Sequence, residues 1–458
     1  KEPLVFEGSL VVVGELQIQG AQEMDGPCIT VLGNMSVIAA RASFVGCINK
    51  KNSGQEVGNG GALHVQENFI TDSDLKFESC EARFQGGGLY AKSFIQKSRI
   101  SLEHYAFNLS GSTRAWSRPN SSVQFRNCKS QDGGGLFAEH FMQEAKASVL
   151  FENCTADLGG GGAHVENHFS QGPHCTARFR GCRAATSHWG GGSGGCLLTT
   201  TFIQEAHSSV LFENCTADLG GCMALGKSGR IPAGAEIRIS QGAGSSAHFQ
   251  SCRAKKGGGL YGLDDASFTQ EVHSTVLFEN CEATEDGGGA YLQHFIQGPK
   301  SSAEFRSCVA KRRGGGLHIK TQGSFSQEAQ SKASFENCEA NASGGGVWTT
   351  SFIQNASAAI FENCTASTGG GGAHVRSVSQ VFNSSASFRG CVVREEGSGG
   401  GLLAEEDFTQ ESSMVLFDNC EAKLGGGGAH VQRFIQGPNS SAAFQSCRVG
   451  EQGGGLAV

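Results

Sequence analysis

Residues 417–436 read Phe-Asp-Asn-Cys-Glu-Ala-Lys-Leu-Gly-Gly-Gly-Gly-Ala-His-Val-Gln-Arg-Phe-Ile-Gln, and variants of this stretch recur along the chain. The tetrapeptide Phe-x-x-Cys occurs fourteen times, each time ahead of a glycine cluster, and from Cys252 to Cys447 the spacing is 26 to 30 residues. A fixed period of this size is typical of stacked like units. We therefore expect a solenoid that grows along one axis, not a set of globular domains.

Each repeat contains three short strand-like segments separated by turn residues. One is the alternating run into Phe-x-x-Cys, one follows the glycines, and one is centred on Phe-x-Gln. None is long enough for a helix, and none can bury an apolar face alone. Stacking them in register predicts an all-β fold, a right-handed parallel β-helix with three short strands per coil and about 14–15 coils of ~27 residues. We expect an N-terminal strand or cap region at 1–43 and a continuous β-helix at 44–458, with outward loops near 97–122 and 226–245.

The composition excludes several classes of protein. Glycine accounts for 68 of 458 residues without a Gly-X-Y period, which excludes collagen. No run approaches 18 apolar residues, so we expect no transmembrane segment. The net charge is −7 with no basic cluster, so we expect no nucleic-acid partner. We also expect no cofactor.

Two features favour an extracellular or cell-surface location. The first is the even number of cysteines, 18. The second is the excess of Asn-x-Ser/Thr sequons over chance, which predicts a secreted glycoprotein. The candidate N-glycosylation sites are Asn34, Asn108, Asn120, Asn153, Asn214, Asn341, Asn355, Asn363, Asn383 and Asn439.

The repeated cysteines are predicted to form a ladder along the solenoid. Its members are Cys47, Cys80, Cys128, Cys154, Cys182, Cys215, Cys252, Cys281, Cys308, Cys338, Cys364, Cys391, Cys420 and Cys447. Neighbours on adjacent coils would have Cα atoms ~4.8 Å apart, so they could form nearest-neighbour disulfides or a column of reduced thiols. Cys196 and Cys222 each follow Gly-Gly in successive coils and are predicted to bond to each other, whereas Cys28 and Cys175 have no obvious partner. No metal site is expected, because a linear column cannot readily surround an ion.

A second column is predicted after the glycines, where the alternate residue is often aromatic or His. This possible surface strip consists of Tyr90, Phe137, His164, Tyr261, Tyr291, His318, Trp348, His374 and His430. It could stack against sugar rings or a neighbouring molecule, or it could simply pack the β-surface. A third pattern lies beside the cysteines: Phe-Glu/Asp-Asn-Cys and Phe-Arg/Gln-Gly/Ser-Cys units mostly alternate, which predicts attraction between stacked Glu and Arg side chains.

These motifs resemble the repeats of the polymorphic outer-membrane proteins of chlamydiae and similar repeats of microbial and protist extracellular proteins. That family carries Phe-x-x-Asn and Gly-Gly-Ala-[Ile/Leu/Val] in each coil, and here Gly161-Gly162-Ala163 with Val165 and Gly427-Gly428-Ala429 with Val431 look similar. In this chain Cys stands where the family has Asn, and an extra residue precedes Val. The resemblance implies a surface-exposed β-helix used in adhesion or as a structural stalk.

We therefore expect a non-enzymatic, glycosylated structural rod that acts as a stalk, coat or filament subunit. Its partners would be further copies of itself, end to end or lateral, other extracellular structural proteins, or glycans. A surface adhesin or carbohydrate-binding β-helix is the first alternative. The second is a pectin-lyase-like polysaccharidase, which would need convergent carboxylates. Asp264-Asp265 and Glu405-Glu406-Asp407 are isolated local pairs in the sequence.

Overall fold

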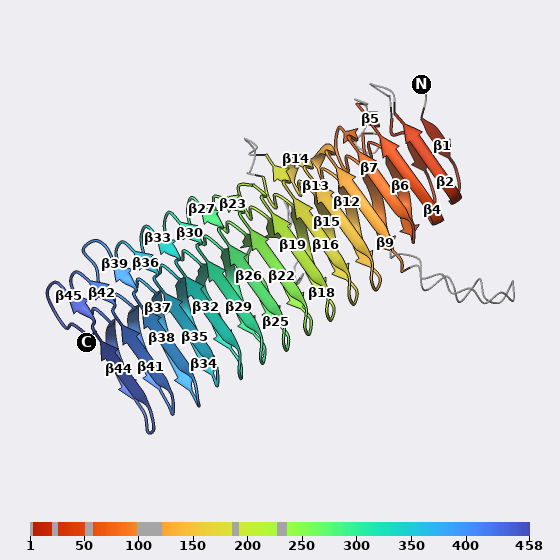
Figure 1. Ribbon diagram of the computed structural model, residues 1–458. Helices are drawn as coiled ribbons and strands as arrows, with labels where there is room; N and C mark the ends of the chain where they lie inside the picture. The colour runs from red at the N-terminus through yellow and green to blue at the C-terminus, as the bar shows by residue number, and fades with distance from the viewer. Residues whose placement is uncertain (1–2, 21–25, 51–57, 99–120, 186–191, 227–235) are drawn as a thin grey trace, which may run out of the picture. The chain divides into compact units, whose positions relative to one another are not determined.

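The computed structural model describes residues 3–20, 26–50, 58–98, 121–185, 192–226 and 236–458. Within these residues the chain is an all-β parallel solenoid of about 14 turns with ~28 residues per turn and no helix. The predicted fold class is confirmed. The chain divides into two compact units, residues 1–218 with 222–235 (unit 1) and residues 219–221 with 236–458 (unit 2). Each unit is a stack of parallel coils (Figure 1).

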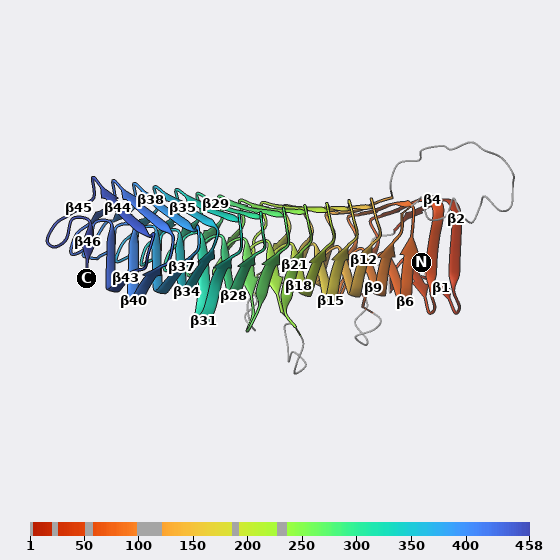
Figure 2. The same ribbon diagram turned by 90° about the horizontal axis from the view of Figure 1, so that it is seen from below.

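The first strand of a coil follows the glycine cluster and runs through Phe-x-Gln. In most coils the second and third predicted segments are thus one continuous strand, interrupted only by a shift in register such as that between Ala138 and His140. In unit 1 these strands are β1 (Leu4–Phe6), β3 (Ile29–Val31), β6 (Leu63–Thr71), β9 (Leu89–Gln96), β12 (Leu136–Gln143), β15 (Ala163–Gln171), β18 (Leu197–Gln204) and β20 (Met223–Leu225). Figure 2 shows β9, β12 and β15 side by side.

Unit 2 repeats the same arrangement, with two coils in which the first strand is split or shortened. Its first strands are β21 (Arg238–Gln241), β24 (Leu260–Gly262), β25 (Ser267–Gln270), β28 (Ala290–Gln297), β31 (Leu317–Gln327), β34 (Val347–Asn355), β37 (Ala373–Val381), β40 (Leu402–Gln410), β43 (Ala429–Gln436) and β46 (Leu456–Ala457). β31 is longer than its neighbours β28 and β34 because it contains extra residues between His318 and Ser324.

The second strand of a coil leads into Phe-x-x-Cys, except in the first coil, where Ile18 is the register partner of Phe44. In unit 1 these strands are β2 (Leu10–Gln19), β4 (Met35–Val45), β7 (Asp74–Glu78), β10 (Ser122–Arg126), β13 (Ser148–Glu152), β16 (Thr176–Arg180) and β19 (Ser209–Glu213). In unit 2 they are β22 (Ser246–Gln250), β26 (Thr275–Glu279), β29 (Ser302–Arg306), β32 (Lys332–Glu336), β35 (Ala358–Glu362), β38 (Ser385–Arg389), β41 (Met414–Asp418) and β44 (Ser441–Gln445).

The third strand is short and directly follows the cysteine. A five-stranded sheet in unit 1 contains β5 (Ile48–Asn49), β8 (Glu81–Ala82), β11 (Lys129–Asp132), β14 (Thr155–Gly159) and β17 (Arg183–Ala184). An eight-stranded sheet in unit 2 contains β23 (Arg253–Ala254), β27 (Glu282–Ala283), β30 (Val309–Ala310), β33 (Glu339–Ala340), β36 (Thr365–Ala366), β39 (Val392–Val393), β42 (Glu421–Ala422) and β45 (Arg448–Val449).

The region expected to be a strand or cap, 1–43, contributes β1 to β3 and most of β4. β1 pairs in parallel with β3, and β2 pairs with β4, which in turn pairs with β6 and β7. These strands therefore have the same pairing as the coils that follow them. Of the two expected outward loops, residues 99–120 and 227–235 lie outside the described residues, and part of the second range forms β21.

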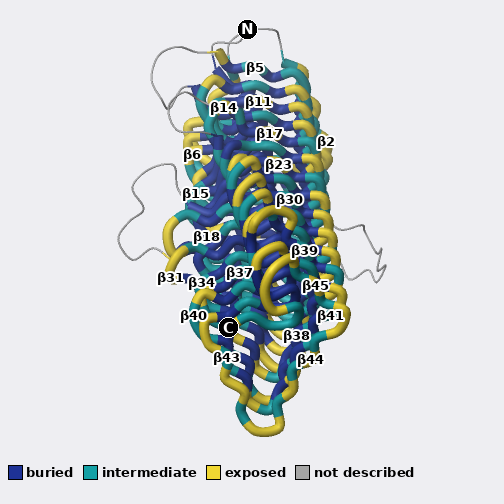
Figure 3. Tube along the Cα trace, turned by 90° about the vertical axis from the view of Figure 1, so that its left-hand side faces the viewer, coloured by how far each residue is buried: buried dark blue, intermediate teal, exposed yellow. Residues whose placement is uncertain are grey.

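The interior of each unit is organised by stacked phenylalanine rings. In unit 1 the Phe-x-x-Cys rings stack with centroids 4.7–5.1 Å apart, in the order Phe44, Phe77, Phe125, Phe151, Phe179 and Phe212. In unit 2 the spacing is 4.6–5.0 Å, in the order Phe249, Phe278, Phe305, Phe335, Phe361, Phe388, Phe417 and Phe444. A fully buried Phe contributes about 1.5–3 kcal/mol. This ladder is therefore a principal source of stability. Figure 3 shows buried residues, in dark blue, recurring from coil to coil along the strands.

A buried ladder of glutamines runs beside the second column of phenylalanines. Along this ladder, Nε2 of one glutamine donates to Oε1 of the glutamine one coil before, over 2.7–3.2 Å. Its members are Gln96, Gln143, Gln171 and Gln204 in unit 1, and Gln241, Gln270, Gln297, Gln327, Gln354, Gln380 and Gln410 in unit 2, none more than 2% exposed. Such a ladder satisfies buried amides only when the coils are in register.

The residue before each ladder cysteine accounts for the two kinds of sequence repeat, Phe-Glu/Asp-Asn-Cys and Phe-Arg/Gln-Gly/Ser-Cys. Its backbone is left-handed throughout, for example φ 52° at Asn153, 62° at Gly181 and 58° at Gly390. Asn and Gly are the residues that adopt this conformation most readily. The alternation of Asn with Gly or Ser at this position therefore meets one backbone requirement in different ways.

The glycine cluster allows adjacent coils to approach closely. Gly344 has φ +68°, and a Cβ on Gly345 would lie 2.2 Å from the carbonyl oxygen of Gly371 and 2.4 Å from that of Thr365. Any side chain at Gly345 would collide with backbone that cannot move aside. The clusters are thus required by coil-to-coil packing.

Candidate functional site

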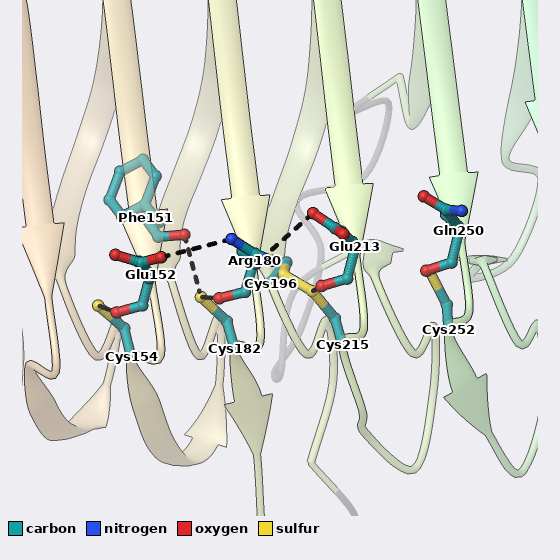
Figure 4. Close-up of a disulfide and its surroundings, with 10 residues drawn as sticks. All are labelled: Phe151, Glu152, Cys154, Arg180, Cys182, Cys196, Glu213, Cys215, Gln250 and Cys252. Carbon is teal, nitrogen blue, oxygen red and sulfur yellow. Dashed lines mark hydrogen bonds and ion pairs between the residues drawn. A yellow bond between two sulfur atoms is a disulfide. The ribbon is translucent and has the colours of Figure 1, made fainter.

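The predicted cysteine ladder forms, and most of it is reduced. Each free ladder thiol lies against the Phe carbonyl of the preceding coil: Cys182 Sγ is 3.6 Å from the Phe151 carbonyl oxygen (Figure 4), and Cys154 Sγ is 3.5 Å from that of Phe125. The free members are Cys80, Cys128, Cys154, Cys182, Cys281, Cys308, Cys338, Cys364, Cys391, Cys420 and Cys447. The nearest-neighbour disulfide alternative is therefore wrong for these residues.

The geometry of a parallel stack explains why these neighbours do not bond. In-register side chains leave the backbone in the same direction, so their Cβ atoms are separated by about the coil spacing of ~4.8 Å. A disulfide needs a Cβ separation of about 3.5–4.5 Å. Burial raises the pKa of the Cys128 and Cys154 thiols, which keeps them protonated and unreactive. The ladder is a packing element with weak S–H donors.

Disulfides instead join a ladder cysteine to a cysteine that directly precedes the first strand of the same coil. Cys196 bonds to Cys215 (Figure 4) and Cys28 bonds to Cys47, each pair with Cα atoms 5.9 Å apart and a sequence separation of 19. The predicted Cys196–Cys222 bond is wrong. Those two cysteines do stack, since the Cys196 amide donates to the Cys222 carbonyl over 2.9 Å, but stacking separates their sulfurs along the coil axis.

The sequence held a signal for these pairs that our reasoning missed. In Gly194-Gly195-Cys196, the cysteine stands where other coils have the third glycine of the cluster. A side chain at this position faces the ladder cysteine of its own coil. Cys222 and Cys252 each take part in a disulfide as well. Cys175 is free and buried, and its thiol donates to the Glu144 carbonyl.

The described residues contain one group of three potential metal ligands, Cys196, Cys215 and Cys222, whose sulfurs lie within 4.8 Å of one another. All three take part in disulfides. A disulfide sulfur is not the thiolate that Zn²⁺ requires. In this oxidised state the three cysteines form covalent crosslinks and not a metal centre.

Alternating charges flank the ladder on the outer surface, as predicted. Arg180 Nη1 lies 4.0 Å from a Glu152 carboxylate oxygen and Arg180 Nε lies 3.5 Å from Glu213 (Figure 4). Arg126 Nε lies 3.3 Å from Glu152. The alternation fails where Glu336 and Glu362 are register partners. Exposed pairs of this kind stabilise a protein little, so their effect is mainly on which coils lie next to each other.

The aromatic and histidine strip also forms a column, with more burial than a surface strip would have. In unit 1 it begins at His64, which the sequence reasoning missed, and continues through Tyr90, Phe137 and His164 with centroids 4.8–5.5 Å apart. Phe137 is 3% exposed and His164 is 6% exposed. Leu198 is the register partner of His164 and continues the column as an aliphatic side chain.

In unit 2 the column runs through Tyr261, Tyr291, His318, Trp348 and His374. Leu403 then separates His374 from His430. His318 is 4% exposed, and burial lowers its pKa to about 3, so this imidazole is neutral. Arg313 lies over the Trp348 ring at 5.1 Å, and Arg312 is 3.6 Å from buried Asp286.

Each carboxylate of the acidic cluster Glu405-Glu406-Asp407 has a partner on the surface. Glu405 contacts His374 at 3.0 Å, Glu406 pairs with Arg376 at 2.6 Å, and Asp407 pairs with Arg433 at 2.6 Å. The strand register shifts between Ala404 and Asp407, and none of the three acidic residues is buried. The three carboxylates therefore contact three different partners.

The predicted glycosylation sites that lie in the described residues are all exposed. These are Asn34, Asn153, Asn214, Asn341, Asn355, Asn363, Asn383 and Asn439. Asn108 and Asn120 lie outside the described residues. Asn153, Asn214 and Asn363 occupy the left-handed turn before a ladder cysteine, so their side chains project from a corner of the coil.

Comparisons with known proteins return no relative: the chain matches no protein-family model, no curated protein and no solved structure. A search of the described residues for helices finds none with the length and apolarity needed to span a membrane. What can be stated about this chain is its architecture, a parallel β-solenoid of like coils with internal ladders and disulfides.

Proposed function

We propose that this protein is a non-enzymatic structural component of an extracellular surface, a glycosylated β-helical stalk, coat or filament subunit. The observation that carries the proposal is the uniformity of the coils. The same Phe, Gln and Cys ladders continue from coil to coil within each unit. In such a solenoid the number of repeats sets the length, which suits a spacer.

Three further observations support an extracellular location. Disulfides are typical of oxidising compartments. The eight described sequon asparagines are exposed, as an oligosaccharide requires. The resemblance of the repeats to polymorphic outer-membrane proteins points to the same surroundings.

Self-association, end to end or lateral, is part of this proposal. Leu4, Val5, Val11 and Val13 on β1 and β2 are 54–75% exposed, although they belong to β-strands. Exposed apolar side chains that lie close together favour contact with another surface. We expect a second β-rich surface to cover them in the native assembly.

Electron microscopy of the native source with a labelled antibody tests the proposal. Label on elongated material at the cell or particle surface, together with a mass decrease on enzymatic deglycosylation, is the expected result. Label confined to the cell interior would contradict it, as would turnover of polygalacturonate or alginate by the purified protein.

A deletion provides an internal test of the spacer role. Removing residues 338–363 joins Asn337 to Cys364 and preserves one Phe-Glu-Asn-Cys motif. It also brings Glu336 next to Arg389 in place of Glu362. We expect a folded protein that is shorter by one coil of ~4.8 Å. Aggregation or loss of circular dichroism signal would show that the coils are not interchangeable.

A further inference from the structure

The column in unit 2 exposes ring edges along most of its length, because each ring covers its neighbour. Tyr261, Tyr291, His318 and Trp348 stack with centroids 4.7–5.4 Å apart and interplanar angles of 11–13°. Ring faces in such a stack are already occupied by other rings. A ligand that binds by stacking therefore has no free face in this part of the column.

The stacking ends between Trp348 and His374. Their centroids are 6.2 Å apart and their planes meet at 63°, so the imidazole does not cover the indole as His318 does on the preceding coil. A hollow of about 280 Å³ lies at this point, and Trp348, Thr350, His374, Arg376 and Glu405 line it. This volume is close to the lower end of small-molecule sites.

The extra residues of β31 form one wall of the hollow. The register between β31 and β34 shifts between His318 and Ser324, and Gln322 has a left-handed backbone with φ 69°. Thr321 and Gln322 both line the hollow. The insertion in β31 and the break in stacking therefore coincide in space.

The charged side chains that line the hollow already have hydrogen-bond partners. His374 Nε2 lies 3.0 Å from Glu405 Oε1, and Arg376 pairs with Glu406 at 2.6 Å. Because Glu405 and Arg376 are both engaged in these contacts, neither is a free partner for a charged ligand. A neutral ligand has the smallest desolvation cost on entering the hollow.

Two buried polar atoms of lining residues have no hydrogen-bond partner among the described residues. They are Thr350 Oγ1 and His374 Nδ1. Burial lowers the pKa of His374, which favours the neutral imidazole. With Nε2–H donating to Glu405, Nδ1 is then an acceptor. Buried polar atoms normally have partners, so hydroxyl groups that donate to Nδ1 and exchange hydrogen bonds with Oγ1 would complete this site.

We propose that the hollow beside Trp348 is a binding subsite for one neutral sugar ring of a glycan chain. The apolar face of the pyranose lies against the indole of Trp348, beside the Arg313 guanidinium that lies 5.1 Å from the ring centroid. Its hydroxyl groups hydrogen-bond Thr350 and His374, with Glu405 and Gln322 at the rim. This assignment goes beyond the structural role above and does not depend on it.

Fluorescence of Trp348 alone tests the proposal. The chain has three tryptophans, and Trp116 and Trp189 lie outside the described residues. In a Trp116→Phe, Trp189→Phe background, neutral tetrasaccharides derived from mannan, β-glucan and chitin are titrated, with tetragalacturonate as the anionic comparison. We expect at least one neutral sugar to change the emission saturably, with a Kd of about 1 mM, as suits a single subsite.

Variants then locate the binding by calorimetry. Trp348→Leu is expected to weaken binding tenfold or more, and Thr350→Val about fivefold. Tyr291→Leu, which alters a ring inside the covered stack, is the matched control and should leave binding within twofold. If Trp348→Leu does not fold, Thr350→Val and the fluorescence change carry the test. The proposal is overturned if no neutral sugar binds, if only tetragalacturonate binds, or if Tyr291→Leu weakens binding as much as Thr350→Val.

Discussion

Replacing Gln297 with Met tests whether the glutamine ladder holds the coils in register. Gln297 is fully buried and makes three hydrogen bonds. Its Nε2 donates to Gln270 Oε1 over 3.2 Å and to the Lys332 carbonyl over 3.1 Å, and its Oε1 accepts from Gln327 Nε2 over 2.9 Å. Methionine has a similar shape and cannot make these bonds.

The expected cost follows from these three bonds. Each contributes about 1 kcal/mol net, and the buried Oε1 of Gln270 left without its donor adds about 1–3 kcal/mol. The free energy of unfolding should therefore fall by about 4–6 kcal/mol. Combining Gln297→Met with Gln327→Met should cost less than the sum of the single changes by about 1 kcal/mol, because the two residues share one bond.

Urea unfolding followed by circular dichroism measures both quantities, provided that the slope with urea is unchanged. Gln432→Met is the control: Gln432 lies on β43 and is exposed, so we expect less than about 0.5 kcal/mol. The reasoning is refuted if Gln297→Met also stays within about 0.5 kcal/mol of the parent, or if the double variant is additive.

Four other outcomes are expected. Gly345→Ala should cost about 3 kcal/mol or more by thermal unfolding, because its Cβ would meet two carbonyl oxygens, whereas Gly8→Ala, with no atom within 4 Å, should be nearly neutral; equal effects would contradict the packing argument. Iodoacetamide should label Cys154 only after unfolding, because burial raises the pKa of this thiol, and labelling of the native protein in mass spectra would show an accessible thiolate. Burial lowers the pKa of His318 from 6.5 to about 3, so the unfolded chain binds the extra proton between these values; stability should fall as the pH falls from 6.5 toward 3, and His318→Phe should flatten that dependence in pH-resolved unfolding. A non-reducing digest should contain one peptide pair joined through Cys196 and Cys215, and recovery of a Cys196–Cys222 pair would overturn the assignment.

The spacing of Phe-x-x-Cys and the glycine clusters was sufficient to predict the parallel solenoid. A repeat that cannot bury its own apolar face must stack, and stacking places equivalent residues over one another. The Phe, Cys and aromatic columns follow from that rule alone. So does the pairing of Glu152 with Arg180.

Sequence reasoning was less successful for contacts within a coil. Cys196 bonds to Cys215, not to Cys222, because the bend at the third glycine position directs its side chain across the corner toward the ladder of the same coil. The Phe-x-Gln motif was visible, but its glutamines were not recognised as a buried hydrogen-bonded ladder. Recognising the ladder requires knowing that the Gln side chain of each coil points into the interior.

The amino-acid sequence by itself therefore determined the architecture, since periodicity along the chain becomes periodicity in space once coils stack in parallel. Only the tertiary structure decided which cysteines bond, where the Gln amides find partners, and where the aromatic column opens at Trp348. These depend on side-chain direction at the bends and on the local insertion in β31, both of which vary while the repeat stays the same.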